Sequence, residues 1–315
     1  MLRLTLPVLL AVIGLLPARG QEPAAQTPAD ATTTNPPVFR AQSDLVVLHV
    51  NVFDGRSDAV AELPRSAFQV FEEGLPQEIT FFSDADVPVA AGLVIDNSSS
   101  MLTRRNMVLA GSRAFITSSH PEDELFTVVF NEHVRLGLQP SVAFTQSQAQ
   151  IHASLLRYPP GGRTAFYDAV FEALDHLQAA THQKRTLVVL SDGDDNASRH
   201  SEADMLHRAA RSEAIVYTIA TFDAAHQEGN AGVLKRLAER TGGVAYFPKT
   251  EADIVRAFTD VAANVRRGYS IGYVPSVTGE DGEYRRVTVR VRVPGRTLSV
   301  RARDGYTAGN DAFTK

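Results

Sequence analysis

Residues 88–101 read PVAAGLVIDNSSSM, an unbroken apolar run that ends in a short polar one. Such a run is typical of a strand buried on both faces of a parallel sheet. Side chains alternate along an extended chain, so Asp96, Ser98 and Ser100 share one face just beyond the predicted strand. One carboxylate and two hydroxyls can therefore converge at the end of a central strand, and hard divalent cations bind such oxygens.

Two later stretches place further oxygen donors in comparable positions. GGRT at residues 161–164 puts the Thr164 hydroxyl on a glycine-rich loop before a predicted helix. LVVLSDG at residues 187–193 puts the Asp192 carboxylate at the end of a second buried strand. Helix capping or turn chemistry accounts for any one of these residues taken alone. The joint pattern, on three loops, indicates a cation site.

Helical and extended patterns alternate from residue 101 to residue 266. The predicted helices lie at residues 101–118, 145–156, 165–180, 202–212, 229–240 and 251–266. The predicted strands that follow the first one lie at residues 125–130, 134–138, 185–190, 215–221 and 244–247. We expect the strand at 134–138 to be antiparallel at the sheet edge. The alternation predicts an α/β fold with a doubly wound, mostly parallel sheet, whose ligands bind at the carboxyl ends of the strands.

Strand patterns flank this region on both sides, at residues 45–53, 67–72, 77–82, 269–274, 285–293 and 297–301. We expect these strands to form one small β-sandwich-like unit that flanks the α/β domain or contains it as an insert. Two separate β appendages, each marginal alone, are the alternative. The predicted boundaries are 43–87 for the N-terminal β segment, 88–267 for the α/β domain, 268–307 for the C-terminal β segment and 308–315 for a tail.

The Asp-x-Ser-x-Ser triplet, the distant Thr and the strand-terminal Asp resemble, in this order, the von Willebrand factor A domain and its metal-ion-dependent adhesion site. The resemblance covers roughly residues 88–266 and implies a doubly wound, Rossmann-like fold. It implies that one divalent cation is held by Asp96, Ser98, Ser100, Thr164 and Asp192. It also implies that an Asp or Glu of a protein partner completes the coordination. The flanking segments are similar to those of a secreted family built around this domain that is common in acidobacteria.

The expected cation is Mg²⁺, with Mn²⁺ or Ca²⁺ as alternatives. Ca²⁺ usually takes more carboxylate and carbonyl oxygens than this set of residues offers. An EF-hand starting at Asp192 is excluded, because Ala197 stands where the loop needs Gly and Ala203 where it needs Glu. His200 and His207 could share a helix face, but we do not expect a second metal site there.

Residues 1–20 contain a basic residue, an apolar run and small residues before Gly20, which predicts a secretory signal peptide cleaved after Gly20. The apolar run is shorter than the ~20 residues that span a bilayer, and we expect no transmembrane segment in the mature chain. Residues 21–42 are rich in Pro, Ala and Thr, which predicts a disordered linker. The chain has no Cys and can form no disulfide. We therefore expect a secreted or periplasmic protein.

Charge and motifs exclude several function classes. The formal net charge is −5, and residues 1–20 hold two Arg and no acid, so the mature chain carries −7 without a basic block. Nucleic acid is not an expected partner, because phosphate binding needs clustered Lys and Arg. The sequence has no nucleophile elbow, zincin, P-loop or dinucleotide motif.

Three functions remain open. The first is non-enzymatic capture of a protein partner through the cation. A metal-dependent hydrolase that uses the same site is the second, since bound Mg²⁺ can activate water. The third is a structural envelope subunit in which the site is vestigial. The sequence does not reveal the partner or the oligomeric state.

Overall fold

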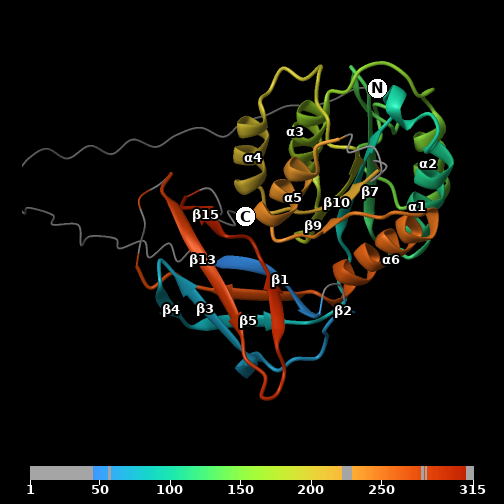
Figure 1. The fold of residues 1–315 in the computed structure, drawn as a ribbon. Helices are drawn as coiled ribbons and strands as arrows, with labels where there is room; N and C mark the ends of the chain where they lie inside the picture. The colour runs from blue at the N-terminus through green and yellow to red at the C-terminus, as the bar shows by residue number, and fades with distance from the viewer. Residues whose placement is uncertain (1–44, 56–57, 222–228, 278–279, 281, 310–315) are drawn as a thin grey trace, which may run out of the picture. The chain divides into compact units, whose positions relative to one another are not determined.

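A six-stranded sheet in the order β11-β10-β9-β6-β7-β8 organises the middle of the chain (Figure 1). Its strands are β6 (Ala90–Asp96), β7 (Glu124–Phe130), β8 (Val134–Leu136), β9 (Arg185–Ser191), β10 (Ile215–Ala220) and β11 (Ala245–Tyr246). Neighbouring strands are parallel except for β7 and β8, which are antiparallel at the edge. The predicted α/β fold with a mostly parallel sheet is confirmed.

The computed structural model describes residues 45–55, 58–221, 229–277, 280 and 282–309. These residues belong to one compact unit. The predicted signal peptide at 1–20 and linker at 21–42, and all but the first two residues of the predicted tail, lie outside the described residues. Within the described ranges, no helix combines the length and apolar character needed to cross a membrane.

Helices cover both faces of this sheet, which is why its central strands are apolar on both sides. They are α1 (Arg105–Thr117), α2 (Gln148–Leu156), α3 (Phe166–His176), α4 (Glu202–Ala210), α5 (Ala231–Arg240) and α6 (Glu251–Arg267). Helix α1 packs against α6 and α2, and α4 packs between α3 and α5 (Figure 1). The helix predicted from residue 101 begins only at Arg105, because Ser99–Met101 form a short 3₁₀ turn.

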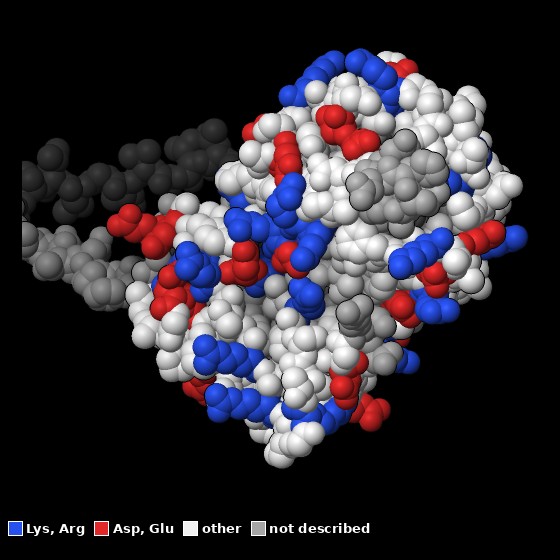
Figure 2. Space-filling model, in the orientation of Figure 1, with Lys and Arg blue, Asp and Glu red and all other residues white. Residues whose placement is uncertain are grey.

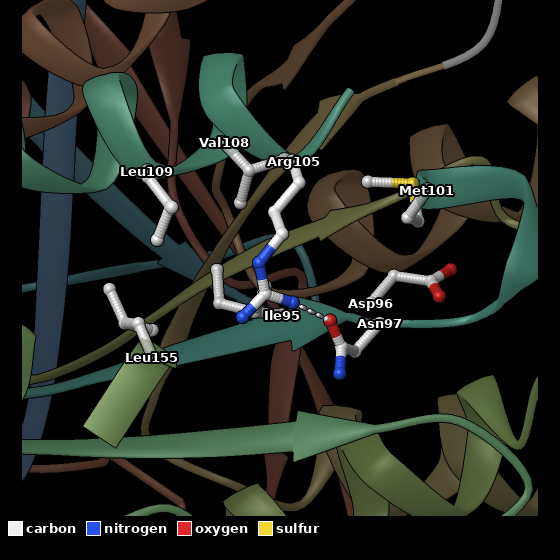
Figure 3. A pocket seen from close by; sticks show the side chains of 8 residues that line it. All are labelled: Ile95, Asp96, Asn97, Met101, Arg105, Val108, Leu109 and Leu155. Atoms are coloured by element: carbon white, nitrogen blue, oxygen red, sulfur yellow. Dashed lines mark hydrogen bonds between the residues drawn. The ribbon is translucent and has the colours of Figure 1, made fainter. Parts of the chain in front are cut away.

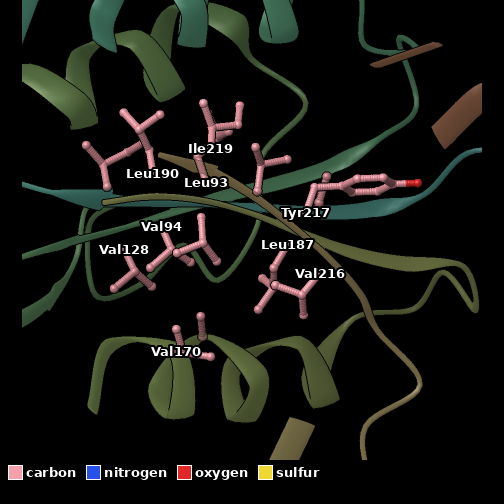
Figure 4. Close-up of a cluster of buried hydrophobic side chains, with 14 of the residues drawn as sticks. Leu93, Val94, Val128, Val170, Leu187, Leu190, Val216, Tyr217 and Ile219 are labelled. Carbon is pink, nitrogen blue, oxygen red and sulfur yellow. The ribbon is translucent and has the colours of Figure 1, made fainter. Parts of the chain in front are cut away.

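The alternation of side chains across β6 is visible in the core (Figure 4). Val94 points toward Val170 of α3, whereas Leu93 points to the opposite face of the sheet. Every residue of β6 is buried. Gly92 allows the close packing here, because a Cβ at this position would lie 2.3 Å from the Phe126 ring. Such two-sided burial is what the unbroken apolar run predicts.

The β segments before and after the α/β domain pair with each other. Strand β1 (Val46–Asp54) pairs with β12 (Tyr269–Tyr273) and with β14 (Leu298–Arg301). Strand β3 (Phe68–Glu72) pairs with β13 (Tyr284–Val291). The remaining strands are β2 (Asp58–Ala59), β4 (Leu75–Gln77), β5 (Ile79–Ser83) and β15 (Gly305–Thr307).

Two antiparallel sheets result, with the strand orders β14-β1-β12-β5, to which β2 adds beside β1, and β15-β13-β3-β4. Their facing side chains share one hydrophobic core, which includes Leu48, Val70, Tyr269 and Val289. The core draws residues from both segments, and each segment alone is small for burying this much apolar surface.

A buried ionic cluster joins the two β segments inside this core. Glu72 is 1% exposed, and its Oε1 lies 2.8 Å from Nη1 of the buried Arg285. Its Oε2 accepts hydrogen bonds from the hydroxyls of Tyr273 (2.6 Å) and Tyr306 (3.1 Å). One carboxylate on β3 thus contacts β12, β13 and β15. Removing a single charge from such a cluster leaves its partner buried and unpaired.

The first prediction concerns this cluster. Glu72→Gln should lower the free energy of unfolding by about 3–5 kcal/mol, because it leaves the Arg285 guanidinium without a counter-charge. The double variant Glu72→Met/Arg285→Met should regain at least half of that loss. Urea unfolding followed by circular dichroism measures both values.

The matched control is Asp54→Asn, which breaks the exposed Asp54–Arg296 pair, whose side chains are 52% and 40% exposed. It should change the free energy of unfolding by less than about 1 kcal/mol. A Glu72→Gln variant as stable as this control would contradict the assigned role of the cluster.

Candidate metal centre

The two predicted carboxylates lie at the same edge of the parallel sheet. β6 and β9 are hydrogen-bonded neighbours in a register that pairs Ile95 with Leu190. Asp96 ends β6, and Asp192 directly follows β9. Asp96 and Asp192 are 2% and 6% exposed, respectively. Parallel neighbours in this register bring their carboxyl ends together, which is where α/β sheets bind ligands.

A chain of hydrogen bonds connects four of the five predicted residues. The Ser98 N–H donates to Asp96 Oδ1 (2.9 Å). The hydroxyl oxygens of Ser98 and Ser100 lie 3.1 Å apart. The Ser100 hydroxyl donates to Asp192 Oδ2 (2.8 Å). The structure therefore brings these four side chains together, as the sequence predicts.

Thr164 lies on the adjoining loop, whose backbone bonds to the other two loops. Ser99 N–H donates to the Gly162 carbonyl (3.1 Å). Thr164 N–H donates to Asn196 Oδ1 (2.9 Å), four residues beyond Asp192. Within the described part of the chain, no hydrogen bond joins the Thr164 hydroxyl to the other four predicted residues. The loop is thus beside the candidate site, and the ligand role of Thr164 stays a prediction.

Ser191 is a member of the cluster that the sequence pattern did not identify. It is fully buried, and its hydroxyl donates to Asp96 Oδ2 (2.7 Å) while accepting from the Gly193 N–H (3.0 Å). Side chains of consecutive residues in a strand point to opposite faces of the sheet, so Ser191 and Asp192 were not expected at the same site. The available signal was a hydroxyl at the end of the otherwise apolar run LVVLS.

Burial raises the pKa of Asp96 to about 6, because its charged form is poorly solvated. Hydrogen bonds from Ser98 and Ser191 lower the pKa, and the nearby charge of Asp192 raises it further. Among the described residues, neither Asp96 nor Asp192 pairs with a Lys or Arg side chain. Two neighbouring carboxylates without a basic partner are suited to a cation.

The donor chemistry fits cations that prefer oxygen ligands, such as Mg²⁺ or Mn²⁺, better than cations that prefer nitrogen or sulfur ligands, such as Zn²⁺. In the described ranges, no three His, Cys, Asp or Glu side chains are grouped to hold a metal. The cluster here offers two carboxylates, and its other oxygens are hydroxyls, which are hard ligands. His200 contacts Asp168 (2.7 Å) and stacks on Phe171 (4.1 Å between ring centroids), which accounts for it without a second metal.

Comparisons with known proteins identify the fold of this region. Residues 92–194 match the family model of the von Willebrand factor type A domain. All five predicted ligand positions fall inside the matched range. No curated protein matches the chain in sequence.

Solved structures are similar at low sequence identity. A von Willebrand factor type A protein from Catenulispora acidiphila is 15% identical, with 85% of this chain and 75% of that chain covered and a TM-score of 0.50. The PilB minor pilin from Streptococcus sanguinis is 16% identical, with 59% and 63% covered and a TM-score of 0.48. The von Willebrand factor domain of the type V pili tip protein Mfa5 from Porphyromonas gingivalis is 13% identical, with 57% and 96% covered and a TM-score of 0.48. At these identities the similarity concerns the fold alone.

The second prediction follows from the raised pKa of Asp96. A carboxyl whose folded pKa is raised favours folding most below its unfolded pKa, and this contribution is lost as pH rises through the folded value. The metal-free protein should therefore lose on the order of 2–3 kcal/mol through this group between about pH 4 and pH 6. Asp96→Asn should remove this dependence and raise the melting temperature at pH 7.5 in the presence of chelator.

Differential scanning calorimetry of both proteins from pH 4 to pH 7.5 measures the difference. Asp54→Asn, at an exposed carboxylate away from the cluster, serves as the control and should follow the wild type. A metal-free Asp96→Asn variant that melts below the wild type at pH 7.5 would contradict the electrostatic account.

Proposed function

We propose that this protein is a non-enzymatic binding protein that acts outside the cytoplasm. Its α/β domain captures an acidic side chain of a protein partner through a divalent cation. The proposed ligands of the cation are Asp96, Ser98, Ser100, Thr164 and Asp192. The observation that carries the proposal is the hydrogen-bonded row from Asp96 to Asp192, which joins two carboxylates that have no Lys or Arg partner among the residues that the structure describes.

Exposure at the rim of the cluster supports access for a partner. Asp96, Ser98 and Asp192 are buried, whereas Ser100 is exposed. A partner's carboxylate can therefore approach the cluster past Ser100. The five proposed donors leave one position of a six-coordinate shell open, and a third carboxylate could fill it as a ligand.

The hydrolase alternative needs a general base, and Asp194 and Asp195 are the candidate acids that follow Asp192 in the chain. Asp195 Oδ1 already accepts hydrogen bonds from the Tyr167 N–H (3.3 Å) and from the Ser198 hydroxyl (2.5 Å). These bonds use the carboxylate to hold the start of α3. A general base must be able to reach the proton that it abstracts. The arrangement therefore favours binding over hydrolysis.

The charge distribution supports a protein partner rather than nucleic acid. Figure 2 shows Lys and Arg side chains interspersed with Asp and Glu over one face of the molecule. Several surface charges pair with one another, as in Arg240–Asp304 (3.0 Å) and Arg296–Asp54 (2.8 Å). A nucleic-acid surface would need basic side chains free to contact successive phosphates. The extracytoplasmic location rests on the signal-peptide pattern in residues 1–20.

The third prediction tests the cation. Titration calorimetry of Mg²⁺ and Mn²⁺ into the purified chain should detect one site, and Asp192→Ala should weaken its affinity more than about 10-fold, because it removes one of the two charged ligands. Asp304→Ala removes a carboxylate remote from the cluster and should bind as the wild type does. Absence of binding by the wild type would leave the vestigial site as the better account.

The fourth prediction tests partner capture. The immobilised chain should retain a protein from an extracytoplasmic extract in Mg²⁺, release it on addition of chelator, and fail to retain it as Asp192→Ala. The control column carries Asp304→Ala. Retention that is indifferent to chelator would contradict capture through a cation, and phosphoester or peptide turnover abolished by Asp192→Ala would instead establish the hydrolase.

A further inference from the structure

Asn97 and Arg105 lie directly behind the candidate metal centre and have no part in the proposed ligand set. Together with Asp96 and apolar side chains such as Leu155, they line a cavity of about 10 Å³ (Figure 3). Arg105 extends from the first turn of α1 across this cavity toward Asn97. Asn97 is the residue between Asp96 and Ser98 in the metal-binding triplet, and it is 6% exposed.

Three hydrogen bonds join this pair to the chain at residues 158–159, and a fourth joins Arg105 to Asn97. Arg105 Nη1 donates to Asn97 Oδ1 (2.9 Å), and Arg105 Nη2 donates to the Tyr158 carbonyl (3.2 Å). Asn97 Nδ2 donates to the carbonyls of Tyr158 (3.1 Å) and Pro159 (2.9 Å). A guanidinium can only donate, so its bond to Oδ1 fixes the orientation of the amide and directs both amide hydrogens at the two carbonyls.

The loop held in this way leads to Thr164. Beyond Pro159, Gly161 N–H donates to the Asn97 carbonyl (2.8 Å). Gly161 and Gly162 have φ angles of 151° and 85°, which few other residues adopt. Two consecutive glycines give the loop many accessible conformations, so its position depends on the bonds that hold it.

We propose that Arg105 is a positioning residue for the metal centre. Acting through Asn97, it holds residues 158–162 so that Thr164 stays beside Asp96 and Asp192. The inference rests on the proposed function, since it assigns a role in cation binding to residues that do not contact the cation. The role depends on geometry: the planar guanidinium of Arg105 orients the Asn97 side-chain amide, and this amide donates to the carbonyls of Tyr158 and Pro159.

Electrostatics alone predicts the opposite effect of removing Arg105. A guanidinium lining the cavity behind Asp96 repels a divalent cation, so its removal should tighten cation binding if charge is what matters. Loss of positioning should instead weaken binding. The sign of the change therefore distinguishes the two accounts. Arg105→Lys keeps the charge but loses the fork, so positioning predicts weaker binding for this variant as well.

The test is a double-mutant cycle on Mn²⁺ affinity, measured by calorimetry on the full chain. Arg105→Met and Arg105→Lys should each weaken binding about 10-fold, the scale expected for residues that orient a ligand. Arg105→Met/Thr164→Ala should bind no more than about 2-fold more weakly than Thr164→Ala alone, because both changes remove the same contribution. Arg113→Met, an exposed arginine on the same helix, should bind as the wild type does.

Amide hydrogen exchange separates this inference from the proposed function. Exchange of the Gly161 and Thr164 amides should accelerate in Arg105→Met without metal, while β9 amides stay protected. Unchanged exchange, tighter Mn²⁺ binding, or effects of Arg105→Met and Thr164→Ala that multiply would each overturn the positioning role. A wild type that binds no cation but shows the accelerated loop exchange in Arg105→Met would refute the proposed function while leaving the loop clamp established.

Discussion

The parallel register between β6 and β9 is the constraint on which the candidate site depends. It sets two strand ends at one level, so that Asp96 and Asp192 lie at the same edge of the sheet. Ser191, which is 95 residues from Asp96 in the chain, donates a hydrogen bond to it there. Both strands are buried on both faces. A shift of the register would move their apolar side chains out of their packing positions in the core, so the core fixes the register. The core therefore specifies the site as strictly as it specifies the sheet. The hydroxyls of Ser98 and Ser100, on the loop after β6, then connect the two carboxylates.

Much of the fold could be predicted because its signals are local. The apolar run at residues 88–96 and the alternation of patterns after it indicate a parallel sheet, and the confirmed edge strand β8 follows from its shorter pattern. The very short strands β4 and β15 were not separated from their surroundings, because two or three residues show no period. Helix α1 begins later than its pattern indicates, because the 3₁₀ turn of Ser99–Met101 occupies the first part.

The residues of the candidate site could likewise be predicted where their signal is local in the sequence, and not where it depends on remote partners. Asp96, Ser98 and Ser100 share a local motif, and Asp192 ends a recognisable strand, so the sequence identified the four residues that the structure connects. Ser191 was missed because its partner, Asp96, is remote in the chain. The partners of Asn97, the carbonyls of Tyr158 and Pro159, are remote in the same way, so its bonds to that loop could not be predicted. Only the folded chain reveals which groups such polar side chains reach.

The α/β domain begins and ends on two strands that are hydrogen-bonded neighbours. Ser83, at the end of β5, pairs with Ser270, near the start of β12, so the chain leaves the β unit and returns to it at almost the same point. The α/β domain therefore lies in the chain between the two strands of one antiparallel pair, β5 and β12. A short turn in its place would leave every strand pairing of the β unit possible, and a different domain whose termini lie equally close could occupy the same position. The α/β domain, which carries the candidate metal site, is thereby a module whose two ends lie on paired strands of the β unit.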